Sequence, residues 1–281
     1  MSLRLSGPLV SAETLARSID DPRLRIADVR WYLGDPRRGR EEYAAGHIRG
    51  AVFIDLDHDL AAPAGPGRHP LPDPTAFADR MGQLGFGDEH VIVAYDTSNG
   101  MVAARLWWML ANLGHQEVAV LDGGLAAWTE SGGELTSLLP THLRTTMSLA
   151  DHWSATIDRS TLAADLEAVD LVDVRAPERY RGEVEPVDRV PGHIPGARSR
   201  PASGLLDERG RLQPADRLQH LLRAPGSRAE RPQVMACGSG VNACFGILAS
   251  RIAGLPDPLL YPGSYSDWSS ARLPVRTGSE P

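Results

Sequence analysis

Cys237 is the residue of this chain whose surroundings most clearly indicate chemistry. An apolar stretch, residues 234–236, leads into it, a glycine-rich turn follows, and a helical pattern begins at about residue 243. A strand, a tight turn and a helix in this order direct backbone N–H groups and the positive end of the helix dipole towards the turn. Such dipoles favour a negatively charged sulfur, so the pattern predicts a nucleophilic thiol. The alternative is a buried structural cysteine, because free cysteines are often buried.

The turn after the cysteine has the composition of an anion-binding loop. Gly238 and Gly240 tolerate positive φ angles, which allow consecutive N–H groups to point inward. Val241 and Asn242 come next, and the side chain of Asn242 can cap the following helix. Two glycines around one residue are common in ordinary turns, but here they directly follow a strand and a cysteine. That position makes the pattern specific.

The length, composition and net charge of the chain limit the classes of protein to which it can belong. Its 281 residues are enough for two domains, and 42% hydrophobic with 23% charged residues is typical of a globular protein. A net charge of −7 argues against nucleic acid or an anionic membrane surface as the main partner. The longest apolar run, residues 106–111, is too short to span a bilayer, and the N-terminal residues lack the layout of a signal peptide.

The two cysteines indicate a cellular compartment. Cys237 and Cys244 lie seven residues apart across a predicted turn and helix, so we expect no disulfide between them. A reducing compartment such as the cytoplasm fits this pattern. We expect Cys244 to pack inside the helix, and a role as a resolving cysteine is the less favoured reading.

The sequence repeats itself at an offset of about 145 residues. Asp28 and Asp173 begin matching Asp-Val-Arg segments, and His47 and His193 occupy matching Gly-His-Ile-x-Gly-Ala segments. The same order of motifs over such a long period indicates two copies of one domain. Because these four residues occur in both copies, we expect them to support the fold rather than to bind a metal or catalyse a reaction.

Each copy alternates short apolar segments with helical patterns, which predicts an α/β fold with a mainly parallel sheet flanked by helices. The expected strands cover residues 24–27, 91–95 and 118–121 in the first copy and 171–174, 233–236 and 259–261 in the second. The expected helices of the first copy cover residues 11–19, with Ser11 as the cap, and 106–113. Those of the second copy cover residues 160–168, with Ser160 as the cap, and 243–253. Ligands usually bind beyond the carboxyl ends of such strands, where Cys237 lies.

The repeat also sets the expected domain boundaries. We predict an N-terminal domain over residues 1–135, a polar linker over 136–158 and a C-terminal domain over 159–281.

Together these features resemble the rhodanese-type sulfurtransferases, in particular the tandem-domain 3-mercaptopyruvate and thiosulfate sulfurtransferases. The resemblance covers nearly the whole chain and implies two rhodanese-like domains, of which the first is inert because Asp96 replaces the cysteine. The loop Cys-Gly-Ser-Gly-Val is similar to that of the mercaptopyruvate branch, whereas the thiosulfate branch typically has a basic pair in place of Gly238 and Ser239. Asn242 stands where the family usually has threonine.

The resemblance also implies the chemistry of the site. Cys237 would take a sulfane sulfur from the donor as a persulfide and pass it to a thiol, such as that of thioredoxin, or to cyanide, without a cofactor. Ser239 would relay protons together with His69 and Asp57 of the first domain. From the residues alone, the favoured interpretation is that His69 is an exposed loop histidine and Asp57 a turn residue, and it is the resemblance that favours the catalytic role.

Two arginines are candidates for binding the donor. The resemblance implies that Arg179 holds the anionic group of the substrate, for which a guanidinium fork is well suited. Arg189 is a weaker second candidate. A solvated surface arginine is the alternative reading of both.

The leading expectation is therefore a sulfurtransferase that uses 3-mercaptopyruvate, with a thiosulfate sulfurtransferase as the close alternative. A persulfide carrier that hands sulfur to a protein partner would use the same loop. A cysteine phosphatase is disfavoured. Such an enzyme needs an arginine after the cysteine and five intervening residues, but that position holds Ala243, and the loop is one residue shorter than phosphate requires. The histidines show no metal-binding spacing, so we expect no metal site.

Overall fold

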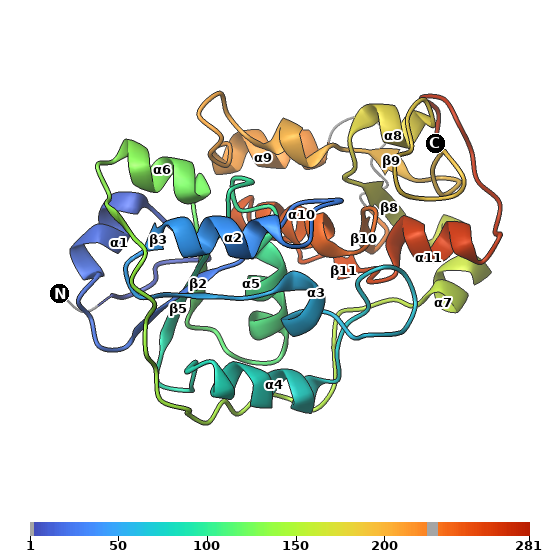
Figure 1. Ribbon diagram of the computed structural model, residues 1–281. Helices are drawn as coiled ribbons and strands as arrows, with labels where there is room; N and C mark the ends of the chain where they lie inside the picture. The colour runs from blue at the N-terminus through green and yellow to red at the C-terminus, as the bar shows by residue number, and fades with distance from the viewer. Residues whose placement is uncertain (1–2, 224–229) are drawn as a thin grey trace. The chain divides into compact units, whose positions relative to one another are not determined.

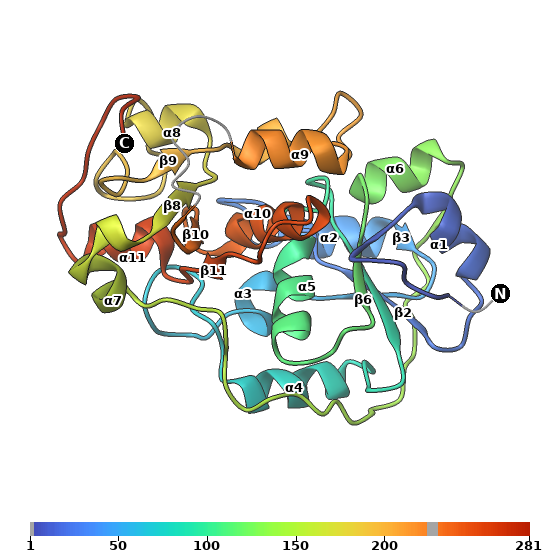
Figure 2. The same cartoon turned by 180° about the vertical axis from the view of Figure 1, so that it is seen from behind.

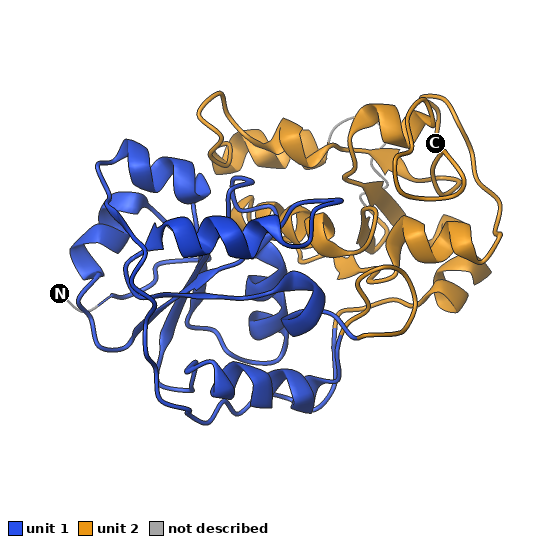
Figure 3. Cartoon of the chain, in the orientation of Figure 1, with its two compact units in different colours: residues 1–62, 72–154 blue, residues 63–71, 155–281 orange. Residues whose placement is uncertain are grey.

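The protein consists of two compact units, seen in a computed structural model that describes residues 3–223 and 230–281 (Figure 1 and Figure 3). Unit 1 comprises residues 1–62 and 72–154, and unit 2 comprises residues 63–71 and 155–281. The segment predicted as a linker is thus divided, since its residues up to Ser154 belong to unit 1 and those from Ala155 to unit 2. Residues 63–71 come from the first sequence copy but pack into unit 2.

Unit 1 is built on a five-stranded parallel sheet in the order β1-β6-β5-β2-β4. A separate antiparallel pair joins β3 to β7. The strands are β1 (Leu9–Val10), β2 (Leu24–Asp28), β3 (His47–Ile48), β4 (Ala51–Phe53), β5 (Val91–Tyr95), β6 (Val118–Leu121) and β7 (Leu135–Thr136). The helices are α1 (Ala12–Ser18), α2 (Arg38–Ala45), α3 (Leu56–Asp59), α4 (Pro74–Gln83), α5 (Ala103–Asn112) and α6 (Gly124–Glu130).

Both faces of the central strand β5 are covered, which is why all five of its residues are buried. Val91, Val93 and Tyr95 share a core cluster with Leu15 of α1 and Trp128 of α6. Alternate residues of a strand point to the opposite face of the sheet, and α5 packs against β5 and β6. A continuous apolar strand is therefore the expected sequence for this position.

Unit 2 repeats the architecture with a four-stranded parallel sheet in the order β11-β10-β8-β9. Helix α9 lies beside α10 in Figure 1 and again in the reverse view of Figure 2. The strands are β8 (Asp170–Asp173), β9 (Arg198–Ser199), β10 (Gln233–Ala236) and β11 (Leu259–Leu260). The α-helices are α7 (Arg159–Ala164), α8 (Pro177–Arg181), α9 (Ala215–Leu222), α10 (Val241–Ile252) and α11 (Ser264–Ser270), and the 3-10 helices are η1 (Leu166–Ala168) and η2 (Ala202–Leu205).

The expected strands and most of the expected helices are present, with differences at the helix ends. The helix predicted to start at Ser160 begins at Arg159, because the carboxylate of Asp158 accepts a hydrogen bond from the N–H of Thr161. It ends at Ala164, and Asp165 then caps the short 3-10 helix η1. By contrast, Ser11 caps α1 as predicted, accepting from the N–H of Thr14.

The repeated Asp-Val-Arg segments form the same buried ion pair in each unit. Arg30 donates to both carboxylate oxygens of Asp28 and to the carbonyl of Gly46. In unit 2, Arg175 binds Asp173 and the carbonyl of Gly192 in the same manner. Each arginine thus ties the end of a central strand to the Gly-His-Ile segment of its own unit.

The two repeated histidines also have structural partners, as predicted. His47 stacks on Tyr43 with ring centroids 4.1 Å apart, and its ring nitrogens lie near the carbonyls of Tyr43 and Leu138. His193 stacks on Tyr180 at 3.8 Å, and its nitrogens lie near the carbonyls of Tyr180 and Glu280. Both histidines are completely buried with their ring nitrogens next to backbone carbonyls, which is the environment of residues that support the fold.

None of the helices in the described ranges, 3–223 and 230–281, is both long and apolar enough to cross a membrane.

The buried ion pair of unit 1 gives a stability prediction. Replacing Asp28 with Ala leaves the Arg30 guanidinium buried without its carboxylate, which should lower the free energy of unfolding by about 3–5 kcal/mol. Urea unfolding followed by tryptophan fluorescence measures this, because every tryptophan except Trp268 lies in unit 1. Asp20→Ala breaks the exposed pair with Arg49 and is the matched control, for which we expect little change. Equal effects of the two variants would contradict the prediction.

Candidate functional site

Cys237 lies directly after β10, and backbone hydrogen bonds hold its loop against the start of α11. The N–H of Cys237 donates to Oγ of Ser264 at 3.0 Å, and its carbonyl accepts from the N–H of Tyr265 at 3.0 Å. The carbonyl of Gly238 accepts from the N–H of Ser266 at 2.9 Å. Helix α10 begins four residues after the cysteine, so its positive end lies next to the loop. The thiol itself is buried, with 4% of the residue exposed.

The two glycines of the loop are required for different reasons. Gly240 has a φ of +76°, and a Cβ there would lie 2.4 Å from the carbonyl oxygen of Pro262. Gly238 does not have a positive φ, so the prediction of that conformation is right for Gly240 and wrong for Gly238. A Cβ on Gly238 would instead lie 2.8 Å from Nη2 of Arg68 and 3.4 Å from Nη1 of Arg179. Gly238 therefore leaves room for two guanidinium groups beside the cysteine.

The corresponding loop of unit 1 shows what this kind of turn can bind. Asp96 follows β5 as Cys237 follows β10, and its fully buried carboxylate accepts four backbone hydrogen bonds. The donors are the N–H groups of Ser98, Gly100, Val102 and Ala103, at 2.7, 2.8, 2.7 and 2.8 Å. Burial raises the pKa of Asp96, although these four hydrogen bonds act in the opposite direction. The turn after the central strand is thus a set of inward N–H donors.

These donors also explain why α5 starts earlier than predicted. The expected helix began at Leu106, but α5 begins at Ala103, where the carboxylate of Asp96 binds two N–H groups at the helix start. In unit 2 the loop is shorter, since α10 begins four residues after Cys237 and α5 seven residues after Asp96.

Ser239 and His69 are brought together in unit 2. Oγ of Ser239 and Nδ1 of His69 are 2.8 Å apart, and both residues are buried, with 7% and 6% exposed. His69 belongs to the segment 63–71. A hydrogen bond of 3.1 Å from the N–H of Arg68 to Oγ of Ser266 attaches this segment to α11. The serine of the cysteine loop therefore has a ring nitrogen with which it can exchange a proton.

Asp57, the third residue predicted for the proton relay, belongs to unit 1. It lies in the first turn of α3, where Oδ2 accepts a hydrogen bond from Nε1 of Trp31 at 2.9 Å. The catalytic role expected for Asp57 stays a prediction.

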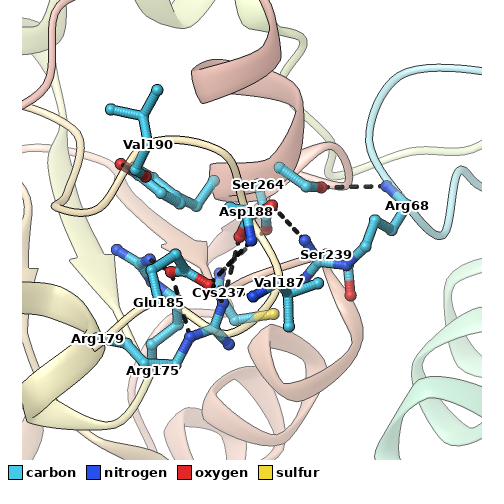
Figure 4. A network of polar contacts seen from close by, with 12 residues as sticks. Arg68, Arg175, Arg179, Glu185, Val187, Asp188, Val190, Cys237, Ser239 and Ser264 are labelled. Carbon is cyan, nitrogen blue, oxygen red and sulfur yellow. Dashed lines mark hydrogen bonds and ion pairs between the residues drawn. The ribbon is translucent and has the colours of Figure 1, made fainter. Parts of the chain in front are cut away.

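Arg179 stands at the end of α8 within a dense network of charges (Figure 4). Its Nη2 donates to Oε1 of Glu185 at 2.7 Å and to Oδ2 of Asp188 at 3.2 Å. Arg175 adds a second cation, 3.5 Å from Glu185, with its guanidinium 3.9 Å from the ring centroid of Tyr265. Arg179 is thus held in a fixed position and faces Gly238.

The two carboxylates of this network differ in their electrostatics. Burial opposes ionisation of Glu185, but hydrogen bonds from Arg179 and from the N–H groups of Asp188 and Val187 outweigh it and lower the pKa of Glu185. Burial raises the pKa of Asp188, and the nearby Arg68 offsets only part of this effect. Asp188 is therefore the more weakly held anion of the two.

Arg68 is a site residue that the sequence reasoning missed. Its Nη1 forms an ion pair with Oδ1 of Asp188, 120 positions later in the chain. The one available signal was its position next to His69, which carried no information about the distant partner.

The remaining residues considered in the sequence differ in their exposure and in their partners. Arg189 is exposed, and the structure gives it no hydrogen-bond or ion-pair partner among the described residues. Val241 is buried in the first turn of α10, next to the partly buried Asn242. Cys244 is buried inside α10, where its thiol donates to the carbonyl of Gly240 at 3.3 Å, and both cysteines are free. Within the described residues, no three histidine, cysteine or carboxylate side chains gather in a way that could hold a metal ion.

The loop geometry predicts the effect of one substitution. Gly240→Ala introduces a Cβ that collides with the backbone of Pro262 at a positive φ, so we expect a less stable protein whose Cys237 no longer reacts at the normal rate. Thermal unfolding and the rate of alkylation by iodoacetamide measure both effects. Gly204→Ala, in η2 with open space around its Cβ position, should behave as the wild type. A normal alkylation rate for Gly240→Ala would show that the loop tolerates the change.

Comparison with known proteins places this geometry in a family. The family model for the rhodanese-like domain matches residues 11–131 and 158–271. A protein of Pseudomonas aeruginosa named a probable 3-mercaptopyruvate sulfurtransferase is 42% identical over 97% of this chain and 99% of its own length. A protein of Mycobacterium tuberculosis whose name assigns it provisionally as a thiosulfate sulfurtransferase is 40% identical over 93% of this chain and 94% of its own.

The solved structures lead to the same family. The crystal structure of a 3-mercaptopyruvate sulfurtransferase from Escherichia coli, titled as having the rhodanese fold, superposes with a TM-score of 0.79 at 33% identity. The match covers 93% of this chain and all of that one. The chain belongs to the rhodanese-like family, as a tandem of two rhodanese-like domains with a cysteine in the loop of the second.

Proposed function

We propose that this protein is a sulfurtransferase that moves a sulfane sulfur from 3-mercaptopyruvate to a thiol or cyanide through a persulfide on Cys237. The observation that carries the proposal is the buried thiol of Cys237 in a loop that leads into α10 and whose Ser239 contacts His69. The similarity to proteins named as 3-mercaptopyruvate sulfurtransferases supports the choice of donor.

The proposed first half-reaction balances without an added oxidant or cofactor. The thiolate of Cys237 attacks the sulfur of the donor and forms an S–S bond, while the C–S bond of the donor breaks. The electron pair of the C–S bond stays with the carbon fragment, which leaves as the enolate of pyruvate and takes up a proton. We propose that Ser239 and His69 supply that proton. Oγ of Ser239 and Nδ1 of His69 are 2.8 Å apart, so a proton can pass between them.

The second half-reaction regenerates the enzyme. The acceptor thiolate, or cyanide, attacks the outer sulfur of the persulfide, and Cys237 leaves as a thiolate that the N–H groups and the helix dipole stabilise. We propose a small-molecule or protein thiol such as thioredoxin as the physiological acceptor. The free state of both cysteines fits a reducing compartment, and we propose the cytoplasm.

The loop favours a carboxylate donor over thiosulfate. Gly238 and Ser239 contribute no charge, so binding of an anionic donor depends on guanidinium groups next to the loop rather than within it. A carboxylate at one end of the donor can bind Arg179 while its sulfur reaches Cys237. The relative provisionally named as a thiosulfate sulfurtransferase keeps thiosulfate as the second candidate donor, and comparison of kcat/KM for the two donors separates them.

The persulfide itself can be observed. After addition of 3-mercaptopyruvate, intact-protein mass spectrometry should show a gain of about 32 Da, the mass of one sulfur atom, on the wild type. The gain should be absent from Cys237→Ser, which has no thiol to accept the sulfur, and present in Cys244→Ser. A gain of the same size on Cys237→Ser would contradict the proposal.

The proposed proton relay makes a prediction about donor selectivity. Ser239→Ala should reduce kcat for 3-mercaptopyruvate by about 10²- to 10⁴-fold and kcat for thiosulfate by less. The reason is that the enolate of pyruvate released from 3-mercaptopyruvate must take up a proton, whereas the sulfite released from thiosulfate need not. Steady-state kinetics with both donors measures this, with Ser203→Ala on the exposed surface of η2 as the control. Losses of equal size for both donors would rule out the relay.

A further inference from the structure

Two guanidinium groups approach the backbone on the same side of the residue after Cys237. The point at which a Cβ of Gly238 would stand is 2.8 Å from Nη2 of Arg68 and 3.4 Å from Nη1 of Arg179. The two arginines come from distant segments of unit 2, the first from the segment 63–71 and the second from α8. Any anionic group bound next to Cys237 on this side would therefore meet both cations.

The spacing of the two guanidinium groups fits one carboxylate. Asp188 demonstrates this, because its Oδ1 pairs with Nη1 of Arg68 and its Oδ2 accepts from Nη2 of Arg179 at 3.2 Å (Figure 4). A carboxylate that accepts one hydrogen bond at each oxygen is the geometry in which arginine binds small organic acids.

The two arginines are held to different degrees. Arg179 is fixed by Glu185, with which it shares two hydrogen bonds at 2.7 and 3.3 Å. Arg68 has Asp188 as its ion-pair partner and keeps about a quarter of its side chain exposed, at 27%. Its buried Nε has no hydrogen-bond partner among the described residues. A donor carboxylate that takes the place of Asp188 would therefore break no other ion pair of Arg68 among the described residues.

The charges of the cluster identify Asp188 as the replaceable anion. The three guanidinium groups of Arg68, Arg175 and Arg179 are matched by the carboxylates of Asp173, Glu185 and Asp188. Asp173 is bound on both oxygens by Arg175, and Glu185 by backbone N–H groups as well as arginine. Asp188 has a raised pKa because of its burial, and among the described residues its carboxylate accepts from the two arginines that face Gly238 and from no others.

We propose that Arg68 and Arg179 together bind the carboxylate of the sulfur donor beside Cys237, and that the carboxylate of Asp188 competes with the donor for these two arginines. The inference rests on the proposed function in that it takes the donor to be a carboxylic acid. It assigns the second cation of the site to Arg68, in place of Arg189, which is exposed and has no partner in the described chain. Arg68 is then a binding residue and Asp188 sets the affinity.

The test uses a binding readout that does not depend on turnover. Pyruvate carries the carboxylate of the proposed donor but no transferable sulfur, so it should protect Cys237 from alkylation by uncharged iodoacetamide. In Arg68→Met the pyruvate concentration that halves the alkylation rate should rise about tenfold or more, because a charged, paired hydrogen-bond donor is lost. The KM for 3-mercaptopyruvate should rise by the same factor, and Arg68→Lys, which keeps the charge, should recover part of it.

Two further variants control for general effects on the fold. Arg181→Met removes the neighbouring arginine of α8, which pairs with Glu183 at the surface, and should leave both quantities unchanged. Asp188→Asn keeps a hydrogen-bond acceptor but removes the competing charge, so it should lower the half-protecting concentration of pyruvate and the KM. This gain should disappear when Asp188→Asn is combined with Arg68→Met.

The outcomes separate this inference from the proposed function. If Arg68→Met binds pyruvate and the donor as the wild type does, or if Arg189→Met shows the loss instead, Arg68 is not the second cation. If the wild type forms no persulfide with 3-mercaptopyruvate, the proposed function fails. The protection of Cys237 by pyruvate still tests the two-arginine site in that case. An Asp188→Asn variant with weaker pyruvate protection would overturn the competing role of Asp188.

Discussion

The arrangement of the site depends on the tight turn that leads from a buried strand into a helix in each unit, and in unit 1 the N–H groups of this turn point inward at Asp96. At Cys237 the chain leaves β10, bonds to the first residues of α11 and enters α10 within four residues. So tight a passage requires a left-handed residue at Gly240 and brings the positive end of α10 next to the sulfur. Because the charge-stabilising groups belong to the backbone, they are fixed by the fold and need no ordering when a negative charge appears.

The two units show the same turn used for two purposes. In unit 1, the carboxylate of Asp96 accepts hydrogen bonds from four N–H groups of the loop, so these groups are already paired with an internal anion. In unit 2 the corresponding side chain is the buried thiol of Cys237, which has no hydrogen bond to the loop within the described part of the chain. Unit 1 thus has the geometry of an anion-binding turn, with an aspartate at the position that corresponds to the nucleophile we propose in unit 2.

The acidic and basic residues around Arg179 serve a different purpose from the loop. Burying several guanidinium groups is costly unless carboxylates compensate them, and Asp173, Glu185 and Asp188 provide that compensation. Under our proposal the same compensation also limits how strongly an anionic donor binds, because the carboxylate of Asp188 competes with it for Arg68 and Arg179. Binding strength at this site is therefore a balance between the stability of the cluster and its attraction for the substrate.

Much of the fold followed from the pattern of apolar residues. The strands β5, β6 and β10 have the predicted limits, because continuous apolar segments of four or five residues are what buried parallel strands require. Helix ends were less predictable. The start of α7 depends on the carboxylate of Asp158 and the early start of α5 on that of Asp96, and each competes with equally plausible caps nearby.

By itself the sequence determined the duplication, the α/β architecture and the candidate chemical centre, because each is expressed in short motifs whose own residues are neighbours in the chain. The cysteine, its glycines and the helix that follows occupy one short segment. Only the tertiary structure decided that residues 63–71 pack into unit 2 and that His69 meets Ser239. The same holds for Arg68 and Asp188, which face each other across 120 positions. Contacts of this kind depend on how loops cross a folded surface, and the local pattern of residue types does not contain that information.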